Sequence, residues 1–335
     1  IHMGIIGDPG TGKSTLMSYV NDVLPNSEYR SGTGLSEAGL TSAAVQEEFA
    51  GETEWTLQPG ILPRADGGHC IIDEIDGAVD SDTKAMHDAL EGDQMVKADK
   101  AGIKADLPSR CALLAGGNPT YTRFRRMEPI AQQIDLDPAL IDRLDLLFAL
   151  QDEVDEARDE KKADHALDAY DALSRAEVAE RDGGDEDGTV ADPPVSKACL
   201  RAWVAYARQE VFPTLTDDVK ESLKAFYVEA RNLNGGYDDD DDAAVPVGMR
   251  TLEAAARLSI AFARLRLSET VEQQDVDRAV DLARDVVGMN YDPESGEFDS
   301  LKNTRGEFDQ LKPDLIGALN RDGPLLPDEL ARMLS

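Results

Sequence analysis

The stretch that decides the fold is Gly7-Asp8-Pro9-Gly10-Thr11-Gly12-Lys13-Ser14, which matches the phosphate-loop pattern G-x-x-x-x-G-K-[ST]. The apolar run before it, residues 2–7, is typical of a strand, and a helical pattern begins at about Lys13. In such a loop, backbone N–H groups surround phosphate oxygens and the lysine reaches the β and γ phosphates. We therefore expect these residues to bind ATP, with Ser14 as a ligand of Mg²⁺. The alternative is a glycine-rich turn before a helix.

Two later apolar runs also end in polar side chains. Cys70-Ile71-Ile72 leads into Asp73 and Glu74, and the run from Leu113 ends at Asn118. We expect Asp73 to hold the Mg²⁺ shell, Glu74 to polarise a water for attack on the γ-phosphate, and Asn118 to position that water. A helix cap at the acids and an ordinary turn at Asn118 remain alternatives. The three elements together are typical of an AAA+ ATPase.

The order of the apolar runs predicts the fold class. Strand-like runs alternate with helical patterns in the first half, which indicates a parallel sheet flanked by helices. From Pro194 onward the pattern is helical. We therefore expect an α/β P-loop NTPase of the AAA+ type, followed by an all-α lid. The strand-like runs are 2–7, 68–74, 111–119 and 144–150, and the helical patterns are 80–91, 196–211, 216–233 and 249–268.

Composition shifts suggest the domain boundaries. The ATPase core is expected over 1–175, an acidic flexible linker over 176–194, and the helical lid over 195–292. A tail over 293–335 is compatible with the start of a winged helix. Residues 234–243, rich in glycine and aspartate, are expected to be a mobile loop.

The charge balance is strongly acidic. Asp and Glu total 67 against 34 Lys and Arg, a formal net charge of -33. The acids are spread along the chain, which argues against an acidic tail for a basic partner and favours adaptation of the surface to concentrated salt.

The cysteine content and the length of the apolar runs indicate the cellular compartment. Three widely separated cysteines argue against a disulfide framework or zinc cluster and suggest buried thiols. No apolar run approaches the ~20 residues that span a bilayer. We expect a soluble cytoplasmic protein with no membrane partner.

Further signals lie in segments 36–44, 54–60, 65–68, 100–103, 117–119 and 142–148, and in a lid region with Pro246 to Leu258. These segments resemble the minichromosome maintenance (MCM) replicative helicases, archaeal type. The resemblance implies the ATP-hydrolysing motor of a ring-shaped hexamer that unwinds duplex DNA in replication. Its cofactors would be ATP and Mg²⁺, and its partners single-stranded DNA in the ring channel and further copies or MCM paralogues, in a nucleoid-associated location.

The same resemblance implies a hairpin before the third strand whose lysine touches DNA in the channel. Lys100 matches that lysine, and Lys97 and Lys104 flank it. Aspartates interleave with them, so a merely solvated hairpin is the alternative. The family also carries an insertion in the helix before the second strand, which corresponds to Gly51 to Gly60, with Trp55 as an apolar anchor or a core residue.

Two arginines also match family positions. Arg143 matches the arginine finger supplied to the neighbouring subunit, and a surface ion pair with Asp142 or Asp145 is the alternative. Arg250 matches the lid arginine that acts as the second sensor. Arg257 and Arg264 follow at helical spacing and are alternatives for the role of second sensor.

The match begins directly at the phosphate loop, without the N-terminal OB-fold and zinc domain of the family. We therefore expect a motor fragment, or a truncated or divergent paralogue. A protein-remodelling or metal-insertion AAA+ ATPase and a non-catalytic paralogue with a regulatory role are the competing functions.

Overall fold

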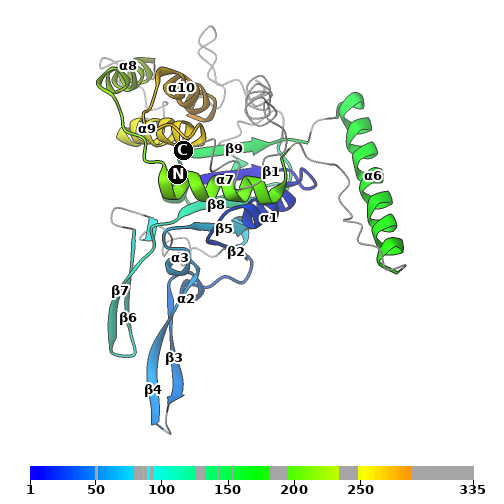
Figure 1. Ribbon diagram of the computed structural model, residues 1–335. Coiled ribbons are helices and arrows are strands. Elements are labelled where there is room, and N and C mark those ends of the chain that lie inside the picture. The colour runs from blue at the N-terminus through cyan, green and yellow to red at the C-terminus, as the bar shows by residue number, and fades with distance from the viewer. Residues whose placement is uncertain are drawn as a thin grey trace. The chain divides into compact units, whose positions relative to one another are not determined.

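The computed structural model describes residues 1–49, 52–78, 86, 89–90, 94–125, 133–141, 143–152, 154–181, 195–233 and 248–287. Its centre is a parallel five-stranded sheet in the order β2-β5-β8-β1-β9 (Figure 1). This sheet, with its helices, confirms the expected α/β P-loop fold. The strands are β1 (Met3–Gly7), β2 (Ser27–Ser31), β5 (His69–Asp73), β8 (Ala112–Gly117) and β9 (Leu146–Leu150).

The register of the sheet decides which loops lie together. Gly7 of β1 pairs with Leu150 of β9, and Ser31 of β2 pairs with Asp73 of β5. The loops that follow β1, β5 and β8 therefore leave from the same edge, here called the carboxyl edge. The segment that precedes β9 lies at the opposite, amino edge. A strand rises about 3.3 Å per residue, so the two ends of β9 are roughly 13 Å apart.

The central strands form because their apolar runs are buried on both faces of the sheet. Ile71 and Ile72 of β5 are almost completely inaccessible to solvent. Ile72 packs with residues of β8 and of the short helix α3 (Ile61–Arg64) in one hydrophobic cluster. On α1 (Lys13–Val23), Met17 is buried. The polar sequence of β2, SEYRS, predicts no strand, and β2 forms at an outer position of the sheet.

Two antiparallel hairpins extend side by side from this domain (Figure 1). One pairs β3 (Ser42–Phe49) with β4 (Glu52–Pro59), and the other pairs β6 (Met95–Lys100) with β7 (Ile103–Pro108). Ala101 and Gly102 connect β6 to β7 with positive φ angles of 51° and 80°, the geometry of a tight two-residue turn.

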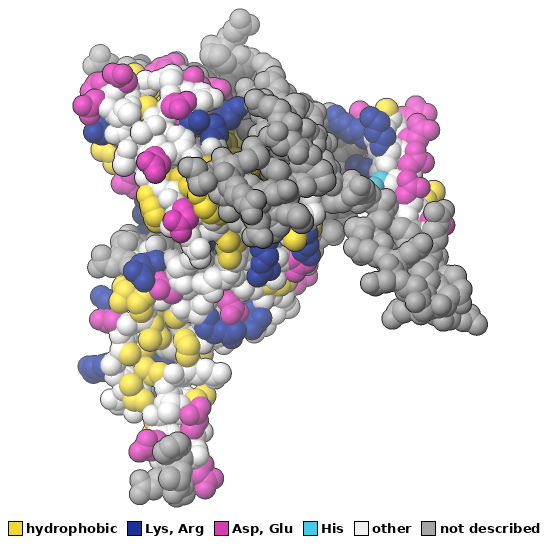
Figure 2. Space-filling view, viewed as in Figure 1, with side chains coloured by type: hydrophobic (Ala, Val, Ile, Leu, Met, Phe, Trp, Pro, Cys, Tyr) yellow, Lys and Arg dark blue, Asp and Glu magenta, His cyan; other side chains and the backbone are white. Residues whose placement is uncertain are grey.

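The β3-β4 hairpin includes the segment expected to be an insertion within a helix. Residues 52–59 form a strand, and the helical turns α2 (Glu37–Leu40) and α3 flank the hairpin. Trp55 is 48% exposed, so it is neither a buried anchor nor a core residue. Hydrophobic side chains gather over the two hairpins on the face shown in Figure 2.

The lid is a helical group with its own core. It comprises α7 (Lys197–Glu210), α8 (Asp217–Leu233), α9 (Met249–Leu265) and α10 (Gln273–Val287). Leu258 of α9 and Ala279 of α10 pack with Leu146 of β9, which joins the lid to the sheet. No helix in the described part of the chain is long and apolar enough to cross a membrane.

A second compact unit contains α6 (Glu156–Arg181). This helix covers residues 176–181, which correct the expected start of the acidic linker. The rest of that linker, the acidic loop at 234–243, the tail at 293–335 and most of the expected helix at 80–91 lie outside the described residues. Cys70 and Cys111 are buried as expected, whereas Cys199 is half-buried.

Candidate active site

The phosphate loop curls around the first residue of α1. Gly10 and Gly12 have φ angles of 83° and 85°, which favour glycine. The Lys13 ammonium donates to the carbonyl oxygens of Gly7 at 2.6 Å and Asp8 at 2.9 Å. The loop is tied to the sheet because the Asp8 N–H donates to the Leu150 carbonyl at 2.9 Å.

Lys13 lies among acids at the carboxyl edge. The residue is only 8% exposed. Burial lowers the pKa of Lys13, and the nearby carboxylates of Asp73, Asp8 and Asp76 oppose this shift. A buried ammonium beside a helix N-terminus with left-handed glycines is a suitable receptor for phosphate oxygens. The loop that the sequence identified, Gly7, Asp8, Pro9, Gly10, Thr11, Gly12, Lys13 and Ser14, thus has the geometry of a phosphate site.

Asp73 ends β5 with its side chain inside the site. Its Oδ2 accepts the Tyr29 hydroxyl at 2.9 Å, and its Oδ1 accepts the Glu74 N–H at 3.0 Å. Burial and this hydrogen bond raise the pKa of Tyr29 to about 12. Each carboxylate oxygen keeps a lone pair, and the exposed Ser14 hydroxyl is a further hard oxygen. These donors suit Mg²⁺, which takes few protein ligands besides water and substrate phosphates.

Glu74 is exposed and adopts a left-handed conformation with φ 55°. Its Oε2 accepts the hydroxyls of Ser31 at 2.7 Å and Thr33 at 3.2 Å. Gly32 lies between these two donors, and a Cβ there would collide with the Glu74 carbonyl oxygen. The absence of a side chain at Gly32 therefore lets the ends of β2 and β5 approach closely enough for both hydroxyls to orient the carboxylate.

Asn118 follows β8 and is fixed by an acid from the turn after β5. The Asn118 N–H donates to Asp76 Oδ1 at 3.1 Å, and its amide nitrogen donates to Oδ2 at 3.4 Å. The amide thus lies at the same edge of the sheet as Lys13, Asp73 and Glu74. The structure brings together these four side chains, as the ends of the apolar runs predict.

Arg143 lies at the other edge of the sheet. It follows the short helix α5 (Pro138–Ile141) and precedes β9, which begins at the level of Met3 rather than Gly7. Within one chain, Arg143 is therefore separated from the phosphate loop by the length of a strand. Asp145, one of its two suggested ion-pair partners, is bound by Arg257, and the other, Asp142, lies outside the described residues.

The lid arginines have different surroundings. Arg250 lies in the first turn of α9 and is half-buried. Arg257 pairs with Asp145 and with Glu253 at 3.5 Å. Arg264 donates to the Val211 carbonyl at 2.9 Å. Arg257 and Arg264 thus both bind groups within this fold.

The hairpin lysines also differ from one another. Lys97 is exposed, and Lys104 pairs with Asp99 at 3.0 Å across the hairpin. Lys100, at the end of β6, donates to the Ser42 carbonyl at 2.7 Å and lies 3.8 Å from Glu37 Oε1. The lysine expected to touch DNA is thus also a link between the two hairpins.

The family model described as the MCM P-loop domain matches residues 1–170. The chain belongs to the MCM family. A second model, described as the MCM AAA-lid domain, matches residues 198–287. A P-loop NTPase domain of this family implies nucleotide binding.

The MCM relatives come from archaea and eukaryotes. The minichromosome maintenance protein MCM of Saccharolobus solfataricus is 37% identical over 300 residues, 89% of this chain and 40% of that protein. DNA replication licensing factor MCM4 of Drosophila melanogaster is 36% identical over 327 residues, 96% of this chain and 35% of that protein. An uncharacterized MCM-type protein of Methanocaldococcus jannaschii is 31% identical and is covered over 45% of its length. The chain spans less than half the length of each of these relatives.

Several side chains of this MCM site carry no motif of their own in the sequence. Tyr29, Ser31 and Thr33 contact the two acids after β5, and they come from a polar segment that has no strand pattern. Asp76 offers a weak signal, because it is the third acid within the run Asp73-Glu74-Ile75-Asp76. The pairing of β2 with β5 brings Tyr29, Ser31 and Thr33 to the site, and the sequence pattern does not predict this pairing.

Proposed function

We propose that the chain is the ATP-hydrolysing motor of a ring-shaped hexameric MCM helicase that unwinds duplex DNA in replication. The observation that carries the proposal is the division of candidate groups between the two edges of the sheet. Lys13, Asp73, Glu74 and Asn118 gather at the carboxyl edge, and Arg143 lies at the amino edge. The partners would be copies of this chain or MCM paralogues, with single-stranded DNA in the channel.

The carboxyl edge supplies the groups for hydrolysis. Lys13 and the N–H groups of the loop bind the β and γ phosphates of ATP, and Ser14 with Asp73 would hold Mg²⁺. When bound, Mg²⁺ neutralises charge on the phosphate oxygens. Glu74 accepts a proton from the attacking water, while Ser31 and Thr33 hold its carboxylate in place. Asn118, fixed by Asp76, orients the water toward the γ-phosphate.

The amino edge supplies the group that completes a neighbour's site. Arg143 and the phosphate loop of the same chain are separated by a strand, so Arg143 reaches a phosphate only in another subunit. A planar, permanently charged guanidinium suits the charge that develops on a transferring phosphoryl group. Such an arginine contributes about 10³ to 10⁵ in turnover. Arg250 of the lid is proposed to act as the second sensor of the γ-phosphate.

The hairpins would bring the motor to DNA. Lys97, Lys100 and Lys104 lie on one short hairpin, and ammonium groups bind backbone phosphates irrespective of sequence. Movement of this hairpin with the nucleotide state would draw a strand through the ring.

The proposal is tested by ATP turnover with and without single-stranded DNA in about 1 M KCl, where surface charge is screened. We expect DNA to stimulate turnover, and Glu74→Gln to abolish it because an amide accepts no proton from water. Glu210→Gln, an exposed glutamate at the end of α7, is the matched control and should retain activity.

Two outcomes would contradict the proposal. An ATP turnover rate that single-stranded DNA does not change would favour a protein-remodelling or metal-insertion ATPase. A correctly assembled protein without turnover would favour a non-catalytic paralogue.

A further inference from the structure

We propose that Asp145 is a positioning residue through which the lid holds Arg143 in place for the neighbouring subunit. This inference rests on the proposed function, since it concerns the arginine assigned to a neighbour's nucleotide. Asp145 lies two residues after Arg143 and directly before β9. Its side chain is 4% exposed, although the segment lies at the amino edge of the sheet.

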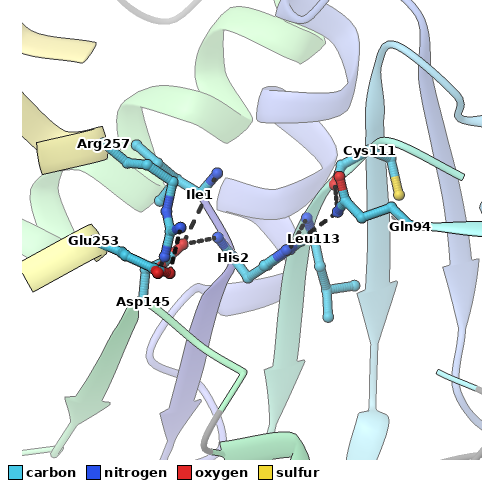
Figure 3. Close-up of polar contacts among 8 residues, drawn as sticks. All are labelled: Ile1, His2, Gln94, Cys111, Leu113, Asp145, Glu253 and Arg257. Carbon is cyan, nitrogen blue, oxygen red and sulfur yellow. Dashed lines mark hydrogen bonds and ion pairs between the residues drawn. The ribbon is translucent and has the colours of Figure 1, made fainter. Parts of the chain in front are cut away.

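Asp145 is bound from two different parts of the fold (Figure 3). Its Oδ1 is paired with Arg257 of α9, and its Oδ2 accepts the His2 N–H at 2.8 Å. The His2 carbonyl in turn accepts the N–H of Asp145 at 2.8 Å and of Leu146 at 3.2 Å. One carboxylate therefore connects the start of β1, the start of β9 and the lid.

The histidine in this network is itself fixed. His2 Nδ1 accepts the Leu113 N–H at 3.1 Å, and Nε2 lies 3.5 Å from the Gln94 amide nitrogen (Figure 3). Burial lowers the pKa of His2 to about 4, so the ring is neutral at physiological pH and accepts at Nδ1. His2, directly before β1, is thus held by a contact with β8 and lies next to Gln94, which directly precedes β6.

Arg257 makes the connection depend on charge. A buried carboxylate needs a cation or several donors, and loss of its partner leaves a charge that is poorly solvated. Glu253, one turn before Arg257 on α9, lies 3.5 Å from the guanidinium and is 57% exposed, so it is a minor partner. Removal of Arg257 would therefore leave the buried carboxylate of Asp145 without its guanidinium partner. Removal of the charge on Asp145 would leave the lid held to this part of the sheet by the apolar packing of Leu258 and Ala279 on Leu146.

The contacts of Asp145 fix the segment that carries Arg143. The Arg143 N–H donates to the Leu140 carbonyl at 2.9 Å, which ties it to the end of α5 on one side. Asp145 ties it to the sheet and lid on the other. Because α9 also carries Arg250 about two turns before Arg257, a shift of the lid would move both candidate arginines together.

The first test separates a positioning role from a structural one. We expect Asp145→Asn and Arg257→Gln to lower kcat about 10- to 100-fold, since a misplacement of about 1 Å costs up to that much. The affinity for Mg-ATP should stay unchanged, because the carboxyl edge of the same subunit is intact. Glu253→Gln is the matched control and should keep wild-type kcat. The double variant should be no worse than either single variant.

The second test asks which side of the interface is damaged. Subunits with Lys13→Ala retain Arg143, and subunits with Arg143→Ala retain Lys13, so a mixture of the two should regain turnover. Asp145→Asn subunits should regain turnover with Lys13→Ala subunits but not with Arg143→Ala subunits. If Asp145→Asn fails to fold, Arg257→Gln carries the same test, because the Arg257 side chain is 43% exposed.

The outcomes distinguish the inference from the proposed function. Recovery of Asp145→Asn with Arg143→Ala, or a loss of Mg-ATP affinity equal to the loss of kcat, would overturn the inference. If Lys13→Ala and Arg143→Ala co-assemble without regaining turnover, the arginine does not act on a neighbour. Both the trans role in the proposed function and the inference that depends on it are then wrong.

Discussion

Lys13 and Glu74 lie at the same edge of the sheet, but their surroundings differ. Lys13 is 8% exposed and bound to loop carbonyls, whereas Glu74 is exposed and bound to two hydroxyls. We expect Lys13→Ala to weaken binding of a fluorescent ATP analogue at least tenfold, because it removes the cation that faces the phosphates. Glu74→Gln should bind the analogue within about twofold of wild type, since the amide keeps the shape of the side chain.

The comparison of the two variants is its own control. An equal loss of affinity in both would contradict Glu74 as the base and would make it a ligand of the nucleotide. Equilibrium titration in the presence of Mg²⁺ measures both affinities.

Among the single residues of the candidate site, the sequence predicts those that follow apolar runs. Lys13, Asp73, Glu74 and Asn118 follow buried strands, and parallel strands place their carboxyl ends at one edge. The side chains that orient them were not predictable in the same way. Tyr29 and Ser31 belong to β2, whose sequence has no apolar run, and the bond between Asp145 and Arg257 joins positions 112 residues apart. Such contacts depend on tertiary packing and not on local pattern.

Among the elements, the two hairpins are linked by Lys100. Its ammonium contacts the Ser42 carbonyl at the start of β3 and lies 3.8 Å from Glu37 of α2. A DNA phosphate would compete with both. We expect Glu37→Gln to raise the affinity for single-stranded DNA about two- to fivefold, because a partly exposed ion pair contributes at most about 1 kcal/mol.

Removal of any acid near DNA raises affinity to some degree, so a matched variant is needed. Glu54→Gln removes an exposed acid from β4 and should have a smaller effect. In a Lys100→Ala background the advantage of Glu37→Gln over Glu54→Gln should disappear. Equal effects of both variants in the wild-type background, measured by fluorescence anisotropy, would contradict the competition.

The elements differ in how well the sequence predicts them. β1, β5 and β8 have apolar runs because both faces are buried, and α7, α8 and α9 lie within about three residues of the predicted helices. The β3-β4 hairpin was not predicted as a hairpin. Its strands satisfy their backbone hydrogen bonds with each other and leave Trp55 exposed, so no buried face imposes a regular pattern.

For the whole molecule, the net charge of -33 is the largest electrostatic feature. Like charges on one surface repel, and salt screens this repulsion within ~3 Å at 1 M. We expect the midpoint of thermal unfolding and the oligomeric fraction to rise between about 0.1 and 1 M KCl and to change little above that. Sucrose at the same osmolality is the control, since it stabilises by exclusion without screening charge.

A midpoint that is the same at low and high KCl would contradict adaptation of the surface to salt. Differential scanning calorimetry and sedimentation velocity on the same samples would measure stability and assembly together.

The placement of Lys13 and Arg143 at opposite edges of the sheet also gives each copy a polarity. Under the proposed function, every molecule carries one half-site at each of these edges, so copies joined head to tail would form one complete site at each junction. An open arc always has one junction fewer than it has members, while a closed circle has equal numbers. Closure thus adds a working site without adding a subunit, and the gain is proportionally largest for the smallest arcs. ATP turnover per subunit would therefore depend on whether the assembly is an open arc or a closed ring, as well as on the chemistry of each site.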